Sequence, residues 1–143
     1  TALITGASDG IGKVFAEKLA SEGYQLVLTS RRKAVLEALA DELKERYAIQ
    51  AHIFAADLAD PHEAETLYQK MNQQNLVIDT LILNAGMGYC DEFYRAPLKR
   101  LEEMVYLNMV SLTQLTHYLL PKMIDMKSGL IIHVASIAAY QPG

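Results

Sequence analysis

Apolar residues are arranged in two alternating patterns along the chain. Short continuous apolar runs are typical of strands that are buried on both faces of a sheet, and apolar residues at every third or fourth position are typical of amphipathic helices. The continuous runs predict strands at residues 1–5, 24–29, 51–56, 80–83 and 129–134. The helical spacing predicts helices at residues 11–22, 33–46, 61–71 and 97–126. Strands and helices therefore alternate from one end of the chain to the other.

This alternation predicts an α/β fold in which a parallel sheet is covered by helices on both faces. Right-handed crossovers between parallel strands then give a doubly wound, three-layer α/β/α sheet of the Rossmann type. The 143 residues suit one domain, and they contain no linker or repeat. The first residues lie inside an apparent strand, and Pro142-Gly143 follow closely on another. We therefore expect a single incomplete domain over residues 1–143, truncated after its fifth strand.

Turn residues support the predicted helix ends. Gly23 stands where a C-terminal capping glycine belongs. Asp60 is a predicted N-cap and Pro61 the first residue of the following helix. Pro121 is expected to end or kink the long helical stretch that contains it.

Composition excludes several classes of function. The net charge is −4, and the only basic cluster is residues 30–33, so nothing indicates nucleic-acid binding. Cys90 is the single cysteine and the four histidines lack ligand spacing, so we expect no metal site. No apolar run is as long as a membrane span, and the first residues lack the layout of a signal peptide. We expect a cytoplasmic protein that binds no membrane.

Groups suited to ligand binding follow all five predicted strands. Ligands of open parallel sheets bind beyond the carboxyl ends of the strands. These ends carry residues 6–8, 30–31, 57–58, 84–86 and 135–136, all of which favour hydrogen bonding or close approach to the backbone. A structural α/β domain also has polar loops, but five such ends in register favour a binding site.

The first of these ends is a glycine-rich turn between a strand and a helix. Gly6 can form the tight turn, Gly10 leaves room for phosphates, and Gly12 allows the helix to pack closely. The helix that follows would direct backbone N–H groups and its positive end at a pyrophosphate. The spacing Gly-x3-Gly-x-Gly differs from the standard Gly-x-Gly-x-x-Gly, and taken alone it could be a purely structural turn.

Four motifs in the same order resemble the amino-terminal part of the short-chain dehydrogenase/reductase family. Residues 5–12 match its TGxxxGIG motif, and residues 83–86 match its NNAG motif with Leu83 in place of the first asparagine. Asn108 matches its helix asparagine and Ser136 its catalytic serine. Residues 86–88 and 103–121 look most like a subgroup that includes ketoacyl and other acyl-chain reductases. The similarity covers essentially the whole chain.

The resemblance implies hydride transfer between a nicotinamide cofactor and a carbonyl or alcohol carbon. Ser136 would hydrogen-bond the substrate oxygen, and Asn108 would break its helix locally and hold a water in a proton relay. Asp57 and Leu58 would contact the adenine, and Asn84, Ala85 and Gly86 the ribose and nicotinamide. The pyrophosphate would lie against the glycine-rich turn, namely Gly6, Ser8, Asp9, Gly10, Ile11 and Gly12. Structural roles remain alternatives, above all for Asn84, which can also tie neighbouring strands together.

The end of the second strand predicts the cofactor. A carboxylate at this position binds the ribose of NAD, whereas arginine accommodates the 2′-phosphate of NADP. The residues here are Ser30, Arg31 and Arg32, which favour NADP over NAD, although a solvated basic turn is the alternative. Asp9 weakens the case for NADP, because relatives that prefer NADP often have a base in the glycine turn.

The family's general acid is a tyrosine followed four residues later by a lysine. That pair is expected about a dozen residues after Ser136, beyond Gly143. Tyr140 is too close to Ser136 to be this tyrosine, whereas Tyr89, Tyr94 and Met87 line a substrate entrance or simply pack. We expect an NADP-dependent oxidoreductase that acts on a small carbonyl or alcohol substrate. The intact protein is expected to form a homodimer or homotetramer. The present chain alone is not expected to complete the reaction. The alternative is a non-catalytic NADP-binding sensor or interaction module.

Overall fold

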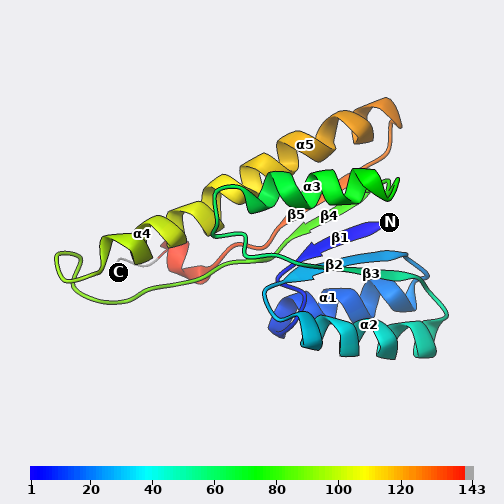
Figure 1. Cartoon of the computed structure of the whole chain (residues 1–143), viewed down its shortest axis with the longest axis horizontal. Coiled ribbons are helices and arrows are strands. Elements are labelled where there is room, and N and C mark those ends of the chain that lie inside the picture. The colour runs from blue at the N-terminus through cyan, green and yellow to red at the C-terminus, as the bar shows by residue number, and fades with distance from the viewer. Residues whose placement is uncertain (141–143) are drawn as a thin grey trace.

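Five parallel strands form the centre of the computed structural model, which describes residues 1–140 and is shown in Figure 1. The order of the strands across the sheet is β3-β2-β1-β4-β5. Ile4 of β1 is paired with Leu28 of β2 on one side and with Ile82 of β4 on the other. The strands are β1 (Ala2–Thr5), β2 (Leu26–Ser30), β3 (Ala51–Ala55), β4 (Thr80–Leu83) and β5 (Leu130–His133). The order reverses direction after β1, so the loops of β1 and β4 diverge there and leave a crevice.

Helices cover the sheet on both faces (Figure 1). On one face lie α1 (Gly10–Ser21) and α2 (Lys33–Tyr47), and on the other lie α3 (Glu63–Gln73) and α5 (Ser111–Asp125). The helix α4 (Leu98–Val105) extends beyond the carboxyl end of the sheet (Figure 1). The predicted three-layer Rossmann-type α/β fold is confirmed.

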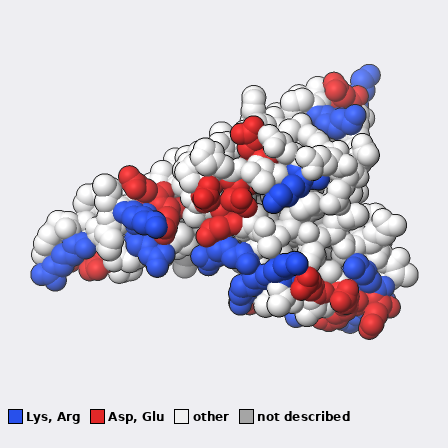
Figure 2. Space-filling model, viewed as in Figure 1, with Lys and Arg blue, Asp and Glu red and all other residues white. Residues whose placement is uncertain are grey.

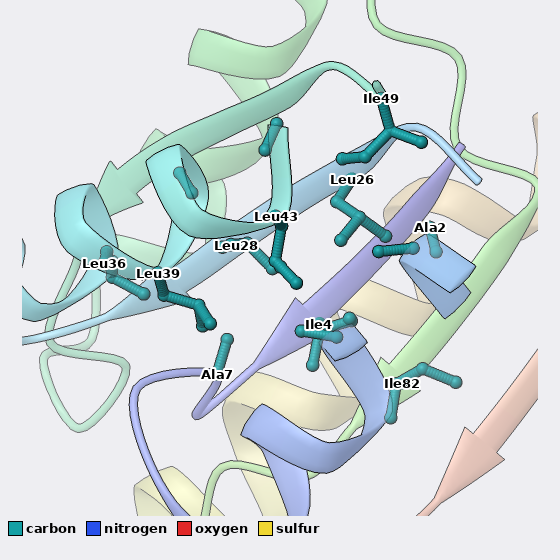
Figure 3. Packing of buried hydrophobic residues seen from close by; sticks show 14 residues of the cluster. Ala2, Ile4, Ala7, Leu26, Leu28, Leu36, Leu39, Leu43, Ile49 and Ile82 are labelled. Carbon is teal, nitrogen blue, oxygen red and sulfur yellow. The ribbon is translucent and has the colours of Figure 1, made fainter. Parts of the chain in front are cut away.

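Each face of the sheet has its own hydrophobic core. Figure 3 shows Leu36, Leu39 and Leu43 of α2 packing towards the strand residues Ile4 and Leu28. All of these side chains are at most 4% exposed. Because β-strands direct alternate side chains to opposite faces, the next residues of the same strands belong to the second core. That core joins Leu3, Val27 and Leu81 to residues of α3 and α5, among them Leu67, Met71, Leu115 and Leu119.

The structure corrects the predicted start of the third helix, and it decides against one of the two outcomes predicted for Pro121. The third helix begins at Glu63 rather than at Pro61, because the Asp60 carboxylate accepts a hydrogen bond from the His62 N–H (2.9 Å) and holds residues 60–62 in a turn. Pro121 does not end its helix, since α5 continues to Asp125. Proline inside a helix costs about 3 kcal/mol, and burial of apolar side chains on both sides of it offsets that cost.

The helix breaks instead around Asn108, as predicted. Residues Tyr106–Val110 form a π-helical turn, η1, between α4 and α5. Its widened hydrogen bonding runs from the Ser111 N–H to the Tyr106 carbonyl, and the Ser111 hydroxyl donates to the Leu107 carbonyl (3.0 Å). Such turns commonly occur at functional sites.

The edge strand β5 has fewer buried residues than the other four strands. This edge strand has no fully buried residue, and Leu130 is 50% exposed. The helices α1 and α2 pack mainly on β1, β2 and β3, and Ile132 of β5 is a partly buried residue that packs against the same core. In residues 1–140, no helix is both long and apolar enough to span a membrane. Pro142 and Gly143, which the sequence places after the last strand, lie outside the described residues.

Candidate functional site

A cleft of about 710 Å³ opens at the carboxyl ends of β1, β2, β3 and β4. This volume lies within the usual range for cofactor and substrate sites. Ten of the residues predicted to bind the cofactor line it: Gly6, Ser8, Asp9, Ser30, Arg31, Arg32, Asp57, Leu58, Ala85 and Gly86. Six other predicted site residues do not line it: Gly10, Ile11, Gly12, Asn84, Asn108 and Ser136. The ends of β1, β2, β3 and β4 therefore meet at one cleft, whereas residues 135–136 after β5 do not line it.

The glycine turn is built by close backbone contacts. Gly6 has a φ of +66°, a conformation that side chains rarely adopt, and a Cβ there would lie 2.9 Å from the Asn84 amide nitrogen. A Cβ on Gly12 would lie 2.3 Å from the Gly6 carbonyl oxygen, which is far inside contact distance. The helix α1 can therefore start directly against the end of β1 only because both positions are glycine.

Backbone N–H groups at the start of α1 remain available to an anion. The Asp9 carboxylate accepts from the Gly10 N–H (2.7 Å), and the Lys13 N–H donates to the Asp9 carbonyl (3.2 Å). The N–H groups of Ile11 and Gly12 have no acceptor within residues 1–140. No other atom lies within 4 Å of the position that a Cβ on Gly10 would occupy. The positive end of α1 thus keeps two backbone donors that have no acceptor within residues 1–140.

Thr5, to which the sequence analysis gave no separate role, joins β1 to β4 beneath the glycine turn. Its hydroxyl accepts from the N–H groups of Asn84 and Ala85, both at 2.9 Å, and Thr5 is fully buried. The Asn84 side-chain amide donates to the carbonyls of Thr5 (3.1 Å) and Gly6 (3.3 Å). Asn84 therefore ties neighbouring strands together, which was one of its two predicted roles. A threonine at a strand end, before the glycine turn, was the signal that could have identified Thr5.

Two arginines follow β2 and behave differently. Arg32 folds back over the glycine turn, where it donates to the Ser8 hydroxyl (3.0 Å) and pairs with the Asp9 carboxylate (3.2 Å). Arg31 lines the cleft and makes no hydrogen bond or ion pair with any other residue of 1–140. The Gly10 N–H, and then Arg32, hold the pKa of Asp9 below its usual value of 3.8, so this carboxylate is charged at neutral pH. The Ser30 hydroxyl accepts from the Arg32 N–H (3.3 Å).

The turn after β3 forms the wall of the cleft next to β2. The Asp57 carboxylate is exposed and accepts from the Ala59 N–H (3.2 Å), while the Leu58 side chain is buried in the core. The hydroxyl of Tyr106, in η1, donates to the Pro61 carbonyl (2.8 Å) and so fixes this turn from the other side.

The loop after β4 is fixed by Asn108. The Asn108 side chain accepts from the Met87 N–H (2.9 Å) and donates to the Met87 carbonyl (2.8 Å). A Cβ on Gly86 would lie 3.3 Å from the side-chain amide oxygen of Asn108, so the Gly86 backbone and the Asn108 side chain also approach each other closely. Both polar atoms of the Asn108 amide are therefore engaged by the backbone, and its predicted role in a proton relay stays a prediction.

Ser136 lies after β5, at the start of the 3-10 turn η2 (Ile137–Tyr140). Its exposed hydroxyl accepts from the Ala138 N–H (3.1 Å), and its carbonyl accepts from the Ala139 N–H (3.1 Å). It follows the sheet on the same edge as the cleft, because β5 is parallel to β4. The catalytic role of Ser136 stays a prediction.

Several lining residues were missed by the sequence analysis. Arg100, Glu103 and Leu107 line the cleft from α4 and η1, and Arg100 pairs with Glu103 (3.1 Å). Their spacing of three and then four residues places them on one face of a helix, which is the signal that could have indicated them. Met87 also lines the cleft, as predicted for a substrate entrance, whereas Tyr89 and Tyr94 do not. Tyr94 is 77% exposed and lies beside the Arg95 guanidinium.

Charged side chains of both signs lie next to each other on the face shown in Figure 2. Ion pairs of neighbouring charges occur along the helices, such as Arg100–Glu103 on α4 and Lys33–Glu37 on α2. Such mixing leaves no extended basic surface on this face.

The chain belongs to a family of oxidoreductases, as comparison with known proteins shows. The profile of the family described as "short chain dehydrogenase" matches residues 1–143. The predicted resemblance is therefore confirmed over the whole chain.

Individual relatives and solved structures are similar to the chain over nearly its whole length. The chain is 36% identical to a very-long-chain 3-oxoacyl-CoA reductase of Ajellomyces capsulatus, over 99% of the chain and 42% of that relative. A short-chain dehydrogenase of Sphingobium yanoikuyae, solved with NADPH, is 33% identical and superposes with a TM-score of 0.91, covering 99% of the chain and 55% of its own. The L-sorbose reductase of Gluconobacter frateurii, solved with NADPH and L-sorbose, is also 33% identical, with a TM-score of 0.92, covering 99% and 54%. The chain thus spans about half the length of these relatives.

Proposed function

We propose that this protein is an oxidoreductase that transfers a hydride between NADP(H) and a carbonyl or alcohol substrate. The observation that carries this proposal is the cleft itself. It combines residues 6, 8 and 9 of the glycine turn with two arginines after β2 and no carboxylate at the end of β2. The N–H groups of Ile11 and Gly12, which follow that turn, have no acceptor among the described residues. The names of the relatives support the proposal, since two of the solved structures contain NADPH.

The residues of the cleft fit a dinucleotide phosphate. The N–H groups of Ile11 and Gly12 have no acceptor within residues 1–140 and lie at the positive end of α1, which suits the pyrophosphate. Arg31, which has no partner among the described residues, suits a 2′-phosphate, because a guanidinium binds phosphate oxygens in pairs. The Asp57 carboxylate is exposed and lines the cleft, which suits the amino group of an adenine as a donor. The bound cofactor would supply the hydride, and the protein would supply placement and proton donors.

Ser136 and Asn108 act on the substrate side in this proposal. The Ser136 hydroxyl donates to the substrate oxygen and holds the carbonyl carbon in place. Asn108 holds the loop after β4 through its two hydrogen bonds to Met87, which fixes the wall on that side. 3-Oxoacyl thioesters are the first ketones to test, because a relative is named for reducing them.

The test is an activity assay on the protein as the cell makes it. Reduction of ketones is monitored through the loss of NADPH absorbance. We expect NADPH to be oxidised only when a ketone is present, and we expect the rate to fall at least a hundredfold in Ser136→Ala. Loss of one catalytic hydrogen-bond donor typically lowers the rate by about 10²–10³. Thr113→Ala serves as a control, because the Thr113 hydroxyl only donates to the Met109 carbonyl on an exposed helix face (2.8 Å). Tight NADPH binding without turnover of any ketone would instead favour a sensor.

A further inference from the structure

The π-helical turn η1 contacts two walls of the cleft at once. Leu107 lines the cleft and packs against the core on the face of α3 and α5. Successive residues of a helix lie about 100° apart around its axis, so Tyr106 and Asn108 flank Leu107 on opposite sides. The Tyr106 hydroxyl donates to the Pro61 carbonyl (2.8 Å), whereas the Asn108 amide bonds to the N–H and the carbonyl of Met87. One helical turn therefore holds both the segment after β3 and the loop after β4.

The segment that Tyr106 holds is a series of tight turns. The Ala59 N–H donates to the Asp57 carboxylate (3.2 Å), and the Asp60 N–H donates to the Asp57 carbonyl (2.8 Å). The Pro61 carbonyl accepts from no backbone N–H of residues 1–140, so its donor there is the Tyr106 hydroxyl. Because Asp57 and Ala59 line the cleft, this hydrogen bond restrains the wall that is proposed to face the adenine.

We propose that Tyr106 is a positioning residue that couples the adenine side of the cleft to the loop after β4. Binding of the adenosine end of the cofactor against Asp57 orders residues 57–61, and the Tyr106 hydroxyl transmits this order to η1. Asn108 of η1 then restrains Met87, which lines the cleft after β4. This inference rests on the proposed function, since it requires that the cleft bind a nicotinamide dinucleotide by its adenosine end.

The Tyr106→Phe variant removes the hydroxyl and keeps the ring. Loss of one hydrogen bond at an exposed position should raise the Kd for NADPH about three- to tenfold. The same increase is expected for 2′,5′-ADP, which has the adenine and the 2′-phosphate but no nicotinamide. Titration calorimetry measures both Kd values on the protein as the cell makes it.

Hydrogen exchange at the Met87 amide distinguishes coupling from a local effect on the turn after β3. In the wild type, saturating 2′,5′-ADP should slow exchange of this amide by about threefold or more, because order at the adenine side reaches the loop through η1. In Tyr106→Phe, saturated with the same ligand, exchange should stay within about 1.5-fold of that of the free protein. A hydroxyl that only stabilised the fold would not produce this difference, because both proteins are compared with their own ligand-free state.

The matched control is Tyr118→Phe. Tyr118 stacks on Tyr68, between α5 and α3 (5.0 Å between ring centroids), and does not line the cleft. Removing its hydroxyl should leave the Kd for 2′,5′-ADP and the slowing at Met87 as in the wild type.

Other outcomes would overturn the inference. Equal Kd values in the wild type and in Tyr106→Phe would mean that the hydroxyl does not position the turn after β3. Undiminished slowing at Met87 in Tyr106→Phe, or its loss in Tyr118→Phe as well, would mean that the two walls are not coupled through Tyr106. A wild type that binds neither ligand would remove the proposed function and this inference with it, whereas binding of both ligands without slowing at Met87 would remove the inference alone.

Discussion

Replacing Thr5 by valine should destabilise the protein without changing the shape of its core. Valine has nearly the same volume as threonine, so the buried space beneath the glycine turn stays filled. The substitution removes the hydroxyl that accepts from the N–H groups of Asn84 and Ala85 at 2.9 Å each. Both donors then lack a partner inside the protein.

The magnitude follows from these two donors. An unsatisfied buried N–H costs about 1–3 kcal/mol, and Asn84 and Ala85 are only partly buried, so the lower half of that range applies to each. The weak bond that the Thr5 hydroxyl donates to the Ile82 carbonyl (3.4 Å) adds little. We therefore expect the free energy of unfolding to fall by about 2–4 kcal/mol in Thr5→Val.

Urea denaturation followed by circular dichroism measures this change. The control is Thr5→Ser, which keeps the hydroxyl and loses only one buried methyl group, and it should cost about 1 kcal/mol. A valine variant that is as stable as the serine variant, or more stable, would refute the view that the Thr5 hydroxyl joins β1 to β4.

Three further predictions concern the same site. Gly12→Ala should destabilise the protein by about 1–3 kcal/mol and weaken NADPH binding, because its Cβ would lie 2.3 Å from a backbone carbonyl oxygen. Thermal melts and NADPH titrations measure the two effects. The control Gly88→Ala should change neither stability nor binding, because no atom lies near its Cβ. Asn108→Ala should speed hydrogen exchange of the Met87 amide and lower stability by about 1–3 kcal/mol, and unchanged exchange would contradict the assigned contact. The Asp9 carboxylate should titrate below 3.8 by NMR, because its hydrogen bond and ion pair favour the charged form. Its contribution to stability is then complete above the unfolded-state pKa and lost as pH falls through the lower folded-state value, and a midpoint above 3.8 would contradict this.

The arrangement of the sheet could be predicted from the sequence because it depends on patterns of many residues. Buried parallel strands are continuous apolar runs, and the helices between them repeat with a different period, so the two are separable without a structure. The strand ends then follow from the parallel topology, and with them the place of Arg31 and Asp57 at one cleft.

Local competition between side chains could not be predicted in the same way. The sequence shows that Asp60 can cap a helix, but not that its carboxylate would hold a turn and delay α3 to Glu63. It shows two arginines after β2, but not that Arg32 would fold back to Ser8 and Asp9. Such choices depend on three-dimensional distances of a few ångströms between segments that lie far apart in the sequence.

The most direct test of the central claim is the affinity of the protein for NADPH and NADH, measured side by side by titration calorimetry, in the wild type and in Arg31→Asp. We expect the wild type to bind NADPH more tightly than NADH, because Arg31 is a cation of the cleft without a partner among the described residues. Arg31→Asp should weaken NADPH by at least tenfold and leave NADH within about threefold, since aspartate repels the 2′-phosphate and accepts from a ribose hydroxyl. A wild type that prefers NADH, or an Arg31→Asp variant that still prefers NADPH, would contradict the account.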